Sequence, residues 1–287
     1  MTRPQGTLWL VATPIGTLGD LPPRACQVLA DADLILAEDT RRARTLLGHA
    51  GIAAGRRLIS FHEHNEAERV GRALAALAEG RAVALISDAG TPVLSDPGFP
   101  LVREARAVGV RVATVPGPSA FTAALAASGQ PPLPATLVGF LPARAAARRR
   151  RIAELGGLSW TVVVLLSPHR LAAELADLAD GFGGDRPATL LAELSKLHER
   201  ALAGSLAELA RSDEAARPRG EYVLVVGPSA AEPPGEAVDR AAIRRAYRAA
   251  VAAGAPRKQA MKAVSAELGL ARRDVFDALV EDEKDDF

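Results

Sequence analysis

A strand and a long polar loop follow one another in AVALISDAGTPVLSDPG, residues 82–98. The continuous apolar run at 82–86 is typical of a parallel strand that is buried on both faces. Ligands of open α/β sheets bind beyond the carboxyl ends of such strands. The loop 87–98 holds two glycines, two prolines and two aspartates, and it is longer than the roughly two to six residues of most connections of this kind. It could be a plain strand-to-helix connection, but its composition favours the wall of a binding pocket.

Working outward from this loop, strands and helical patterns alternate through the first part of the chain. This alternation predicts a mainly parallel sheet whose loops converge on one edge, in a first α/β domain over residues 1–117. A second α/β domain is expected over residues 118–230, with only helix between Arg200 and its last strand. The expected strands cover residues 7–12, 33–37, 58–61, 82–86, 111–115, 136–141, 160–166, 188–192 and 222–226.

Beyond a linker at 232–235, only helical patterns are found. Residues 258–270 and 272–279 have the spacing of a helix-turn-helix, although a plain helical pair has nearly the same pattern. A helical extension is therefore expected over residues 236–281. The acidic end of the chain, 282–287, is expected to be a disordered tail.

Composition limits the classes of function. The chain has 287 residues, a formal net charge of +1, 4% aromatic residues and one cysteine, Cys26. A single cysteine excludes an internal disulfide framework and a zinc site built from cysteines, and it fits a reducing cytoplasm. The sequence shows no signal peptide and no apolar stretch of membrane-spanning length. A nucleic acid would have to be held by local arginine clusters rather than by overall charge or extensive aromatic stacking.

Two such arginine clusters exist. Arg41, Arg42 and Arg44 follow the strand at 33–37, where they could contact phosphates or pair with Glu38 and Asp39. Arg148, Arg149, Arg150 and Arg151 are adjacent, so they surround a helix instead of forming one stripe. A solvated helix is one interpretation; contact with a polyanion, which would relieve their mutual repulsion, is the other.

Two other motifs invite functions that the pattern does not favour. His62 and His64 are close in sequence, yet two residues apart they would point in different directions on a helix, and HExxH is absent. Capping of the following helix by Asn65 is the expected role of that segment. The loop at residues 13–20 contains glycines but neither GxGxxG nor a Walker sequence, so binding of a nucleotide triphosphate is not favoured.

Taken together and in order, the motifs resemble those of the bacterial small-subunit ribosomal RNA (cytidine-2′-O)-methyltransferases, a family of the tetrapyrrole-methylase class. The resemblance covers residues 6–227, and the final helices look like the extension found in that family. Three departures are visible: Thr17 replaces a common Asn, Val93-Leu94 a usual Gly-Ile, and Leu165-Leu166 a usual Tyr-Glu. The motifs are TPIG at 13–16, AEDTR at 37–41, SFHEHNE at 60–66, the loop 87–98, VPGPSA at 115–120, SPHR at 167–170 and KLHE at 196–199.

This resemblance implies a class III methyltransferase fold of two α/β domains with S-adenosylmethionine in the cleft between them, usually within a homodimer. The methyl acceptor would be a ribose 2′-hydroxyl of a cytidine in 16S ribosomal RNA near the decoding centre, with the 30S subunit or its RNA as partner. Metal is not expected. By place in the pattern, the cofactor-lining residues would be Pro14, Asp88, Ala89, Gly90, Thr91, Ser119, Ala120, Leu166 and Val225.

Methyl transfer from a sulfonium requires alignment and, for a hydroxyl acceptor, removal of a proton. We expect the acceptor side to be lined by candidate groups among which the sequence does not choose the base. A small-molecule methyltransferase of the tetrapyrrole type is the nearest alternative, followed by a ligand-sensing DNA-binding regulator. The candidates are Glu38, Asp39, His62, Glu193 and Lys196, with Asp96 close by.

Overall fold

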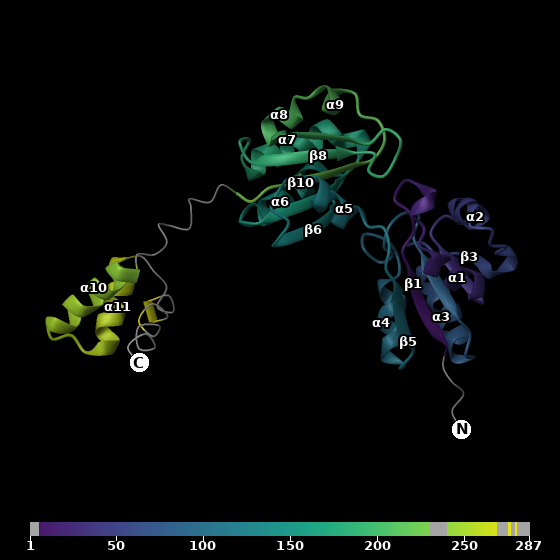
Figure 1. Ribbon diagram of the computed structural model, residues 1–287, viewed down its shortest axis with the longest axis horizontal. Coiled ribbons are helices and arrows are strands. Elements are labelled where there is room, and N and C mark those ends of the chain that lie inside the picture. Colours follow the sequence, from purple (N-terminus) through teal and green to yellow (C-terminus); the bar gives the residue numbers. More distant parts are fainter. Residues whose placement is uncertain (1–5, 230–239, 269–274, 277–278, 280–287) are drawn as a thin grey trace. The chain divides into compact units, whose positions relative to one another are not determined.

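The chain separates into two compact units, residues 1–229 and 230–287. The computed structural model describes residues 6–229, 240–268, 275–276 and 279 of them. The first unit contains two five-stranded sheets (Figure 1). Within the described part of the chain, no helix is both long and apolar enough to cross a membrane.

The first sheet is entirely parallel and has the strand order β3-β2-β4-β1-β5. This confirms the parallel sheet predicted from the alternating pattern. Its strands are β1 (Thr7–Val11), β2 (Leu34–Ala37), β3 (Leu58–Ser60), β4 (Val83–Ile86) and β5 (Arg111–Val115).

Helices cover both faces of this sheet. On one face, Leu29 of α1 and Leu47 of α2 are buried against Ile35 of β2. On the other, Leu77 of α3 and Leu101 of α4 pack in a separate core. The helices are α1 (Pro23–Asp31), α2 (Thr40–His49), α3 (Glu66–Ala78) and α4 (Phe99–Ala107), with short 3₁₀ turns η1 (Leu18–Asp20) and η2 (Gly55–Arg57).

The neighbouring strands β1 and β4 lead to helices on opposite faces. The chain leaves β1 toward α1, which packs in one core, and leaves β4 toward α4, which packs in the other. Such a point in an open parallel sheet leaves a crevice beyond the carboxyl ends of the strands, where ligands bind. The loop 87–98, which follows β4, lies at this crevice.

The second sheet is mixed, with the order β6-β7-β10-β8-β9. Only β6 and β7 are parallel to each other; the remaining pairs are antiparallel. Ala124 of α5 (Ala120–Ala127) is buried on one face with Val163 and Val223, and Ile152 of α6 (Ala145–Gly156) is buried on the other. The strands are β6 (Ala135–Phe140), β7 (Thr161–Leu166), β8 (Pro187–Ala192), β9 (Arg200–Ser205) and β10 (Tyr222–Val226).

The strand β9 was not expected, because the sequence pattern predicts only helix after Arg200. Its sequence RALAGS has no β-branched residue, so its own composition does not indicate a strand. It is held instead by pairing along the whole of β8, from Pro187↔Ser205 to Ala192↔Arg200. The remaining helices of this half are η3 (Pro168–Arg170), α7 (Leu171–Phe182), α8 (Leu206–Ala210) and α9 (Asp213–Ala216).

The second unit contains α10 (Arg240–Ala252) and α11 (Arg257–Glu267). Ile243, Val264 and Val275 form its small buried core. The predicted helical extension is thereby confirmed in kind. The predicted linker 232–235, most of the second helix-turn-helix segment at 272–279, and the tail 282–287 lie outside the described residues. The domain boundaries at 117/118 and 230/236 stay predictions.

Candidate functional site

Two loops are joined at the crevice beyond β1 and β4. The backbone N–H of Thr13 donates to the carbonyl of Gly90 at 2.8 Å, and the N–H of Gly90 donates back to Thr13 at 3.0 Å. The hydroxyl of Thr13, which is fully buried, also donates to the carbonyl of Ser87. These bonds fix the loop 13–20 against the loop 87–98, so both walls of the crevice are preformed.

The loop 87–98 has an unusual backbone. Gly90 and Gly98 have positive φ angles of 80° and 130°, but so do Val93 at 78° and Ser95 at 69°. Left-handed geometry is rare for a β-branched residue, so Val93 holds backbone strain. Strain of this kind persists where the surroundings over-determine the conformation, and here the side chain of Glu66 accepts the N–H of Gly98 at 2.8 Å.

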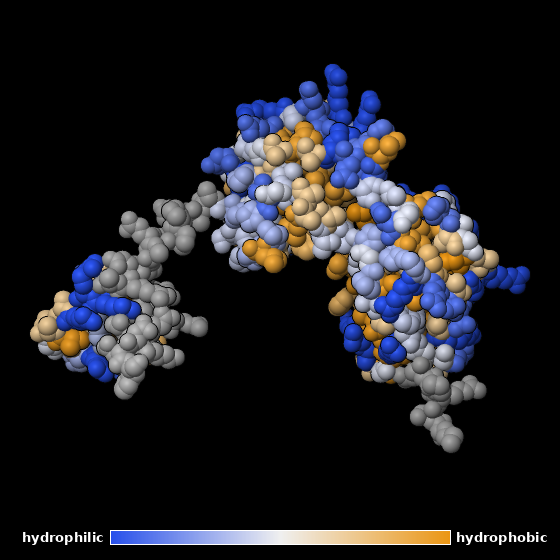
Figure 2. Space-filling model, viewed as in Figure 1, coloured by the Kyte–Doolittle hydropathy of each residue, from blue (hydrophilic) through white to orange (hydrophobic). Residues whose placement is uncertain are grey.

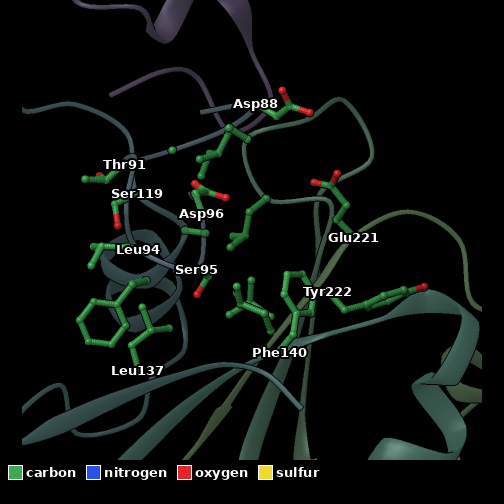
Figure 3. A pocket seen from close by; sticks show the side chains of 18 of the residues that line it. Asp88, Thr91, Leu94, Ser95, Asp96, Ser119, Leu137, Phe140, Glu221 and Tyr222 are labelled. Atoms are coloured by element: carbon green, nitrogen blue, oxygen red, sulfur yellow. The ribbon is translucent and has the colours of Figure 1, made fainter. Parts of the chain in front are cut away.

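A cavity of about 340 Å³ opens between this loop and the second sheet. Its walls come from both halves of the unit, including Leu137 and Phe140 of β6 and Val223 of β10. In Figure 3 the carboxyl group of Asp96 lies in the interior, with Asp88 and Glu221 on one side and Phe140 on another. The predicted cofactor-lining residues that contribute to the walls are Asp88, Ala89, Gly90, Thr91, Ser119, Ala120 and Leu166.

The other two predicted lining residues lie elsewhere. Pro14 lines an adjoining cavity of about 360 Å³. Val225 is fully buried in the core beneath α5, where it pairs with Val163 across β10 and β7. Side chains alternate along a strand, so Val223, two residues earlier on the same face, takes the position at the cavity wall that was assigned to Val225.

Ser119 occupies the N-cap position of α5 but makes no side-chain capping bond. Its side chain lies at the cavity wall beside Thr91 (Figure 3). A serine at the start of a helix can cap the helix or contact a ligand. The hydroxyl is instead available to a ligand in the cavity.

Four carboxyl groups line the cavity: Glu38, Asp88, Asp96 and Glu221. Burial, together with the neighbouring charges of Glu38 and Asp88, raises the pKa of Asp96 to about 7. Burial and the charges of Asp88 and Glu63 also raise the pKa of Glu38. A group of mutually repelling carboxylates in a partly apolar cavity is suited to a cationic ligand, which would compensate them.

Asp88 is held by the start of α2. The backbone N–H of Asp39 donates to Asp88 Oδ1 at 3.0 Å, and the guanidinium of Arg42 lies 3.4 Å from Oδ2. Arg42 lines both the first cavity and the adjoining one. This arginine is therefore part of the site wall rather than of a distant surface.

The adjoining cavity brings Lys196 to the site. Its ammonium group contacts Glu193 at 2.8 Å and Glu221 at 3.1 Å. Burial lowers the pKa of Lys196, but the two carboxylates outweigh it and the net effect is a raised pKa. The bond from Lys196 lowers the pKa of Glu193. A protonated lysine and an ionised, paired glutamate are both poor proton acceptors, so their role is to hold the loop and its charges.

The loop 193–199 packs tightly on the loop 13–20. A Cβ added to Gly16 would lie 2.6 Å from the carbonyl oxygen of Ser195, so only glycine permits this approach. The hydroxyl of Thr17 donates to the same carbonyl, and the hydroxyl of Ser195 donates to Asp20. Glu193 and Ser195 have positive φ angles of 54° and 62°. The strained loop thus closes one end of the cleft between the two sheets.

Asp39 and His62 do not line these cavities. Asp39 caps α2, and its carboxylate accepts two hydrogen bonds from the side chain of Arg41. The hydrogen bonds from Arg41 hold the pKa of Asp39 well below the ordinary range. Arg41 is therefore paired with an acidic neighbour, which is one of the two roles that the sequence allowed for this cluster. Arg44, on the same helix, is exposed.

The capping role expected of Asn65 needs correction. Asn65 stands at the N-cap position of α3, yet its side chain makes no capping bond. Its Oδ1 accepts the backbone N–H of His62 at 2.9 Å, and its amide also contacts the His62 ring and Ser60. The residue therefore shapes the preceding turn. Within the described residues, no group of histidine, cysteine and acidic side chains is arranged to hold a metal.

The second arginine cluster also needs correction. Arg148 is buried, with 4% exposure, and its guanidinium is paired with Asp177 at 2.6 Å. Because its guanidinium is buried and paired, it is not accessible to a phosphate and leaves the predicted RNA-binding set. Arg149 is exposed but also contacts Asp177 at 2.8 Å, and Arg151 pairs with Glu154 at 3.1 Å. Arg150 is exposed on the same helix.

Sequence reasoning missed Glu221 and Tyr222, which line the main cavity. They stand at the amino end of β10, whereas the site was sought at the carboxyl ends of strands. Because β10 is antiparallel to β7, Tyr222 lies opposite Leu166, the last residue of β7. Only the strand directions could have revealed this, and they were not readable from the sequence.

Comparison with known proteins gives a consistent result. The model of the family described as Tetrapyrrole (Corrin/Porphyrin) Methylases matches residues 7–210. A protein of Xylella fastidiosa named Ribosomal RNA small subunit methyltransferase I is 50% identical over 224 residues, covering 77% of this chain and 81% of that protein. A protein of the same name from Mycobacterium tuberculosis is 42% identical over 98% of this chain and 96% of its own length.

Solved structures share the architecture. The uroporphyrin-III-C-methyltransferase of Thermus thermophilus is 26% identical, with a TM-score of 0.52, over 78% of this chain and 94% of that one. A diphthine synthase is 15% identical, with a TM-score of 0.62, over 77% of this chain and 89% of that one. The second likeness concerns the fold alone.

Proposed function

Because the chain belongs to the tetrapyrrole methylase family and, within it, groups with the proteins named ribosomal RNA small subunit methyltransferase I, we propose that it methylates small-subunit ribosomal RNA. The methyl group would come from S-adenosylmethionine and the acceptor would be the 2′-hydroxyl of a cytidine near the decoding centre. The observation that carries this proposal is the acidic cavity between the two sheets, together with the relatives that cover most of the chain.

The residues of the main cavity fit S-adenosylmethionine. The cavity volume of about 340 Å³ lies within the usual range for small-molecule sites, about 300–1,000 Å³. Leu137, Leu166 and Val223 supply apolar walls for the adenine ring. Ser119 and Thr91 supply hydroxyl groups. The carboxylate of Asp88 suits the positive charge of the cofactor. When bound, the cofactor supplies an electrophilic methyl group.

We assign the proton acceptor to Asp96. The transfer is an in-line displacement, so alignment of the 2′-oxygen provides much of the rate and a base provides a further factor. Efficient bases have a pKa near the working pH, and Asp96, with its pKa of about 7, meets this condition inside the cavity. Glu38 would sustain that pKa through its negative charge, while Lys196 and Glu193 would position the loop that bounds the acceptor side.

RNA would be held by the exposed arginines near the site and on α6. Arg42 is the nearest to the cavity, and the buried Arg148 is excluded. With ribosomal RNA as substrate, the protein would act in the bacterial cytoplasm. The remaining arginines proposed to contact phosphates are Arg41, Arg44, Arg149, Arg150 and Arg151.

We also propose that the protein works as a homodimer. The side chains of Phe99 and Phe140 are 62% and 60% exposed, and Phe140 also lines the cavity. Burying such aromatic rings against a second copy would be favourable. Sedimentation equilibrium at micromolar concentration should give twice the mass of 29.9 kDa. A monomer that methylates RNA at full rate would refute the proposed dimer and leave the proposed reaction standing.

The proposed reaction is tested by transfer of a labelled methyl group to three acceptors in parallel: undermethylated 30S subunits, naked 16S RNA and uroporphyrinogen. Label on a cytidine ribose, mapped by nuclease digestion and mass spectrometry, is the expected result. Asp96→Asn should reduce the rate strongly while leaving cofactor binding measurable by calorimetry. Absence of label from both RNA substrates would overturn the proposal.

A small-molecule methyltransferase is the second candidate, and the likeness to the uroporphyrin-III-C-methyltransferase structure favours it. The same experiment distinguishes the two. Label in uroporphyrinogen and none in RNA would establish the second candidate. The basic residues of α10 and α11, which a small acceptor does not need, favour the RNA substrate.

A further inference from the structure

A basic depression lies on the second α/β domain, beside the loop that closes the cleft. It has a volume of about 500 Å³ and includes three arginines and a histidine. The face around α9 and its neighbouring loops is largely hydrophilic (Figure 2). The residues that line the depression are Glu193, His198, Arg200, Glu214, Arg217, Arg219 and Gly220.

The two glutamates of the depression are already neutralised from within the protein. Glu214 accepts from Arg200 at 2.6 Å and also from the hydroxyl of Tyr222. The bond from Arg200 lowers the pKa of Glu214. Glu193 accepts from Lys196 at 2.8 Å and from the backbone N–H of Glu221 at 2.8 Å. Neither carboxylate is therefore free to compensate another cation.

The other two arginines of the depression lack such partners. Arg217 and Arg219 are exposed, and neither forms an ion pair with any residue that the structure describes. His198 is exposed beside them, and its carbonyl accepts from Arg200 at 2.9 Å, which fixes its backbone. The backbone N–H of Arg219 likewise donates to the Tyr222 hydroxyl at 2.7 Å. The backbones are held while the two guanidinium groups remain available.

The depression is joined to the cleft by one loop. Glu193 lines the depression, and Lys196, three residues later, lines the cavity beside the proposed acceptor site. Between the two, Ser195 is bound to Asp20 and Thr17 of the first domain. Leu197, at the tip, is 92% exposed. If one unit of a polymer enters the cleft, the chain of the polymer would pass over this loop. A neighbouring unit would then reach the depression.

We propose that the depression binds phosphate groups of the RNA backbone adjacent to the methylated nucleotide, through Arg217 and Arg219. This rests on the proposed function. A guanidinium presents paired donors that match two phosphate oxygens, and charge-assisted bonds of this kind are among the stronger ones in proteins. The paired glutamates leave the depression with surplus positive charge, which complements a polyanion.

The test compares the double variant Arg217→Ala/Arg219→Ala with Arg72→Ala/Arg106→Ala, which removes two exposed arginines from α3 and α4. Affinity for a 16S RNA fragment is measured as a function of salt, and KM for undermethylated 30S subunits is measured at one salt concentration. We expect the first variant to weaken RNA binding about tenfold or more and to reduce the salt slope by about 1.4, the value for two lost single-strand contacts. Cofactor affinity and kcat should stay within about twofold.

Equal behaviour of the two double variants would overturn the inference. So would a loss of cofactor affinity or kcat with unchanged RNA affinity, because the arginines would then only support the loop. Arg217→Lys/Arg219→Lys should restore the salt slope, since it restores the charge. If the wild-type protein binds the fragment through this depression but methylates no RNA, the proposed function fails and the binding site stands.

Discussion

The guanidinium of Arg148 and the carboxylate of Asp177 form an ion pair 2.6 Å apart, and both side chains are 5% exposed. Asp177 also accepts from Arg149 at 2.8 Å, so one carboxylate joins a buried and an exposed arginine of α6 to α7. Burial raises the pKa of Asp177, but the bonds from Arg149 and Arg148 outweigh it and the pKa is lowered. The pair holds two helices together.

Replacement of Arg148 by alanine should therefore destabilise the protein. The change leaves the charge of Asp177 buried with only the exposed Arg149 to compensate it, and removal of one member of a buried pair costs about 3–5 kcal/mol. Urea unfolding monitored by circular dichroism measures the loss. Arg150→Ala, on the same helix but exposed, is the matched control and should change the free energy of unfolding by less than about 0.5 kcal/mol. Equal losses would contradict a structural role specific to Arg148.

The same arginine shows what the sequence could and could not predict. Four adjacent arginines on a helix point in different directions, but the sequence does not say whether any of them faces the interior. That depends on where Asp177 lies, 29 residues further on. The parallel first sheet was predictable because strand patterns alternate with helical patterns along this part of the chain. Strand β9 was not, because a strand at a sheet edge is stabilised by its partner and not by its own residues.

The site was predictable in one half only. Loops after β1 and β4 carry visible glycines, prolines and aspartates, and they do form the cavity wall. Glu221 and Tyr222 escaped because the direction of β10 is a property of the assembled sheet. The raised pKa of Asp96 likewise depends on the burial and on the charge of Glu38, which is distant in sequence.

Lys196 should act by position and not as a base. Its contacts with Glu193 and Glu221 keep it protonated at neutral pH. Lys196→Met should therefore lower kcat/KM by a similar factor at every pH from 6 to 9, with no change in the inflection of the profile. Lys196→Arg, which keeps the charge, should lose less. Disappearance of an inflection in the methionine variant would instead identify Lys196 as the titrating group.

Gly16 should be required for closure of the cleft. A methyl group there would meet the carbonyl of Ser195 at 2.6 Å, so Gly16→Ala forces the loop 193–199 away. We expect faster hydrogen exchange in that loop and weaker cofactor binding, about tenfold by calorimetry, since the loop helps to preorganise the site. Gly19→Ala is the control in the same loop, because its Cβ would only touch Thr17 at 3.8 Å. Similar effects of both alanines would show that backbone flexibility of the loop, and not the close approach, matters.

The pH profile should report Asp96. Only the ionised carboxyl accepts a proton, and its pKa in the free protein is about 7. The value of kcat/KM should therefore rise about tenfold per pH unit below 7 and level off above it. Because Glu38 helps to raise this pKa, Glu38→Gln should move the midpoint to lower pH, whereas Asp96→Asn should remove the rise together with most of the activity.

Stability should follow the opposite trend at the same residue. The folded protein retains the proton on Asp96 up to about pH 7, whereas the unfolded chain releases it near the ordinary value of 3.8. Between these limits the native state binds more protons, so this group's contribution to the free energy of unfolding falls as the pH rises. Asp96→Asn should abolish that decline, and the difference in unfolding free energy between variant and wild type should be larger at pH 7 than at pH 5. Two results together would remove Asp96 from the role of base. The free energy of unfolding would show the same pH dependence in wild type and Asp96→Asn, and the midpoint of the kcat/KM profile would be unchanged in Glu38→Gln.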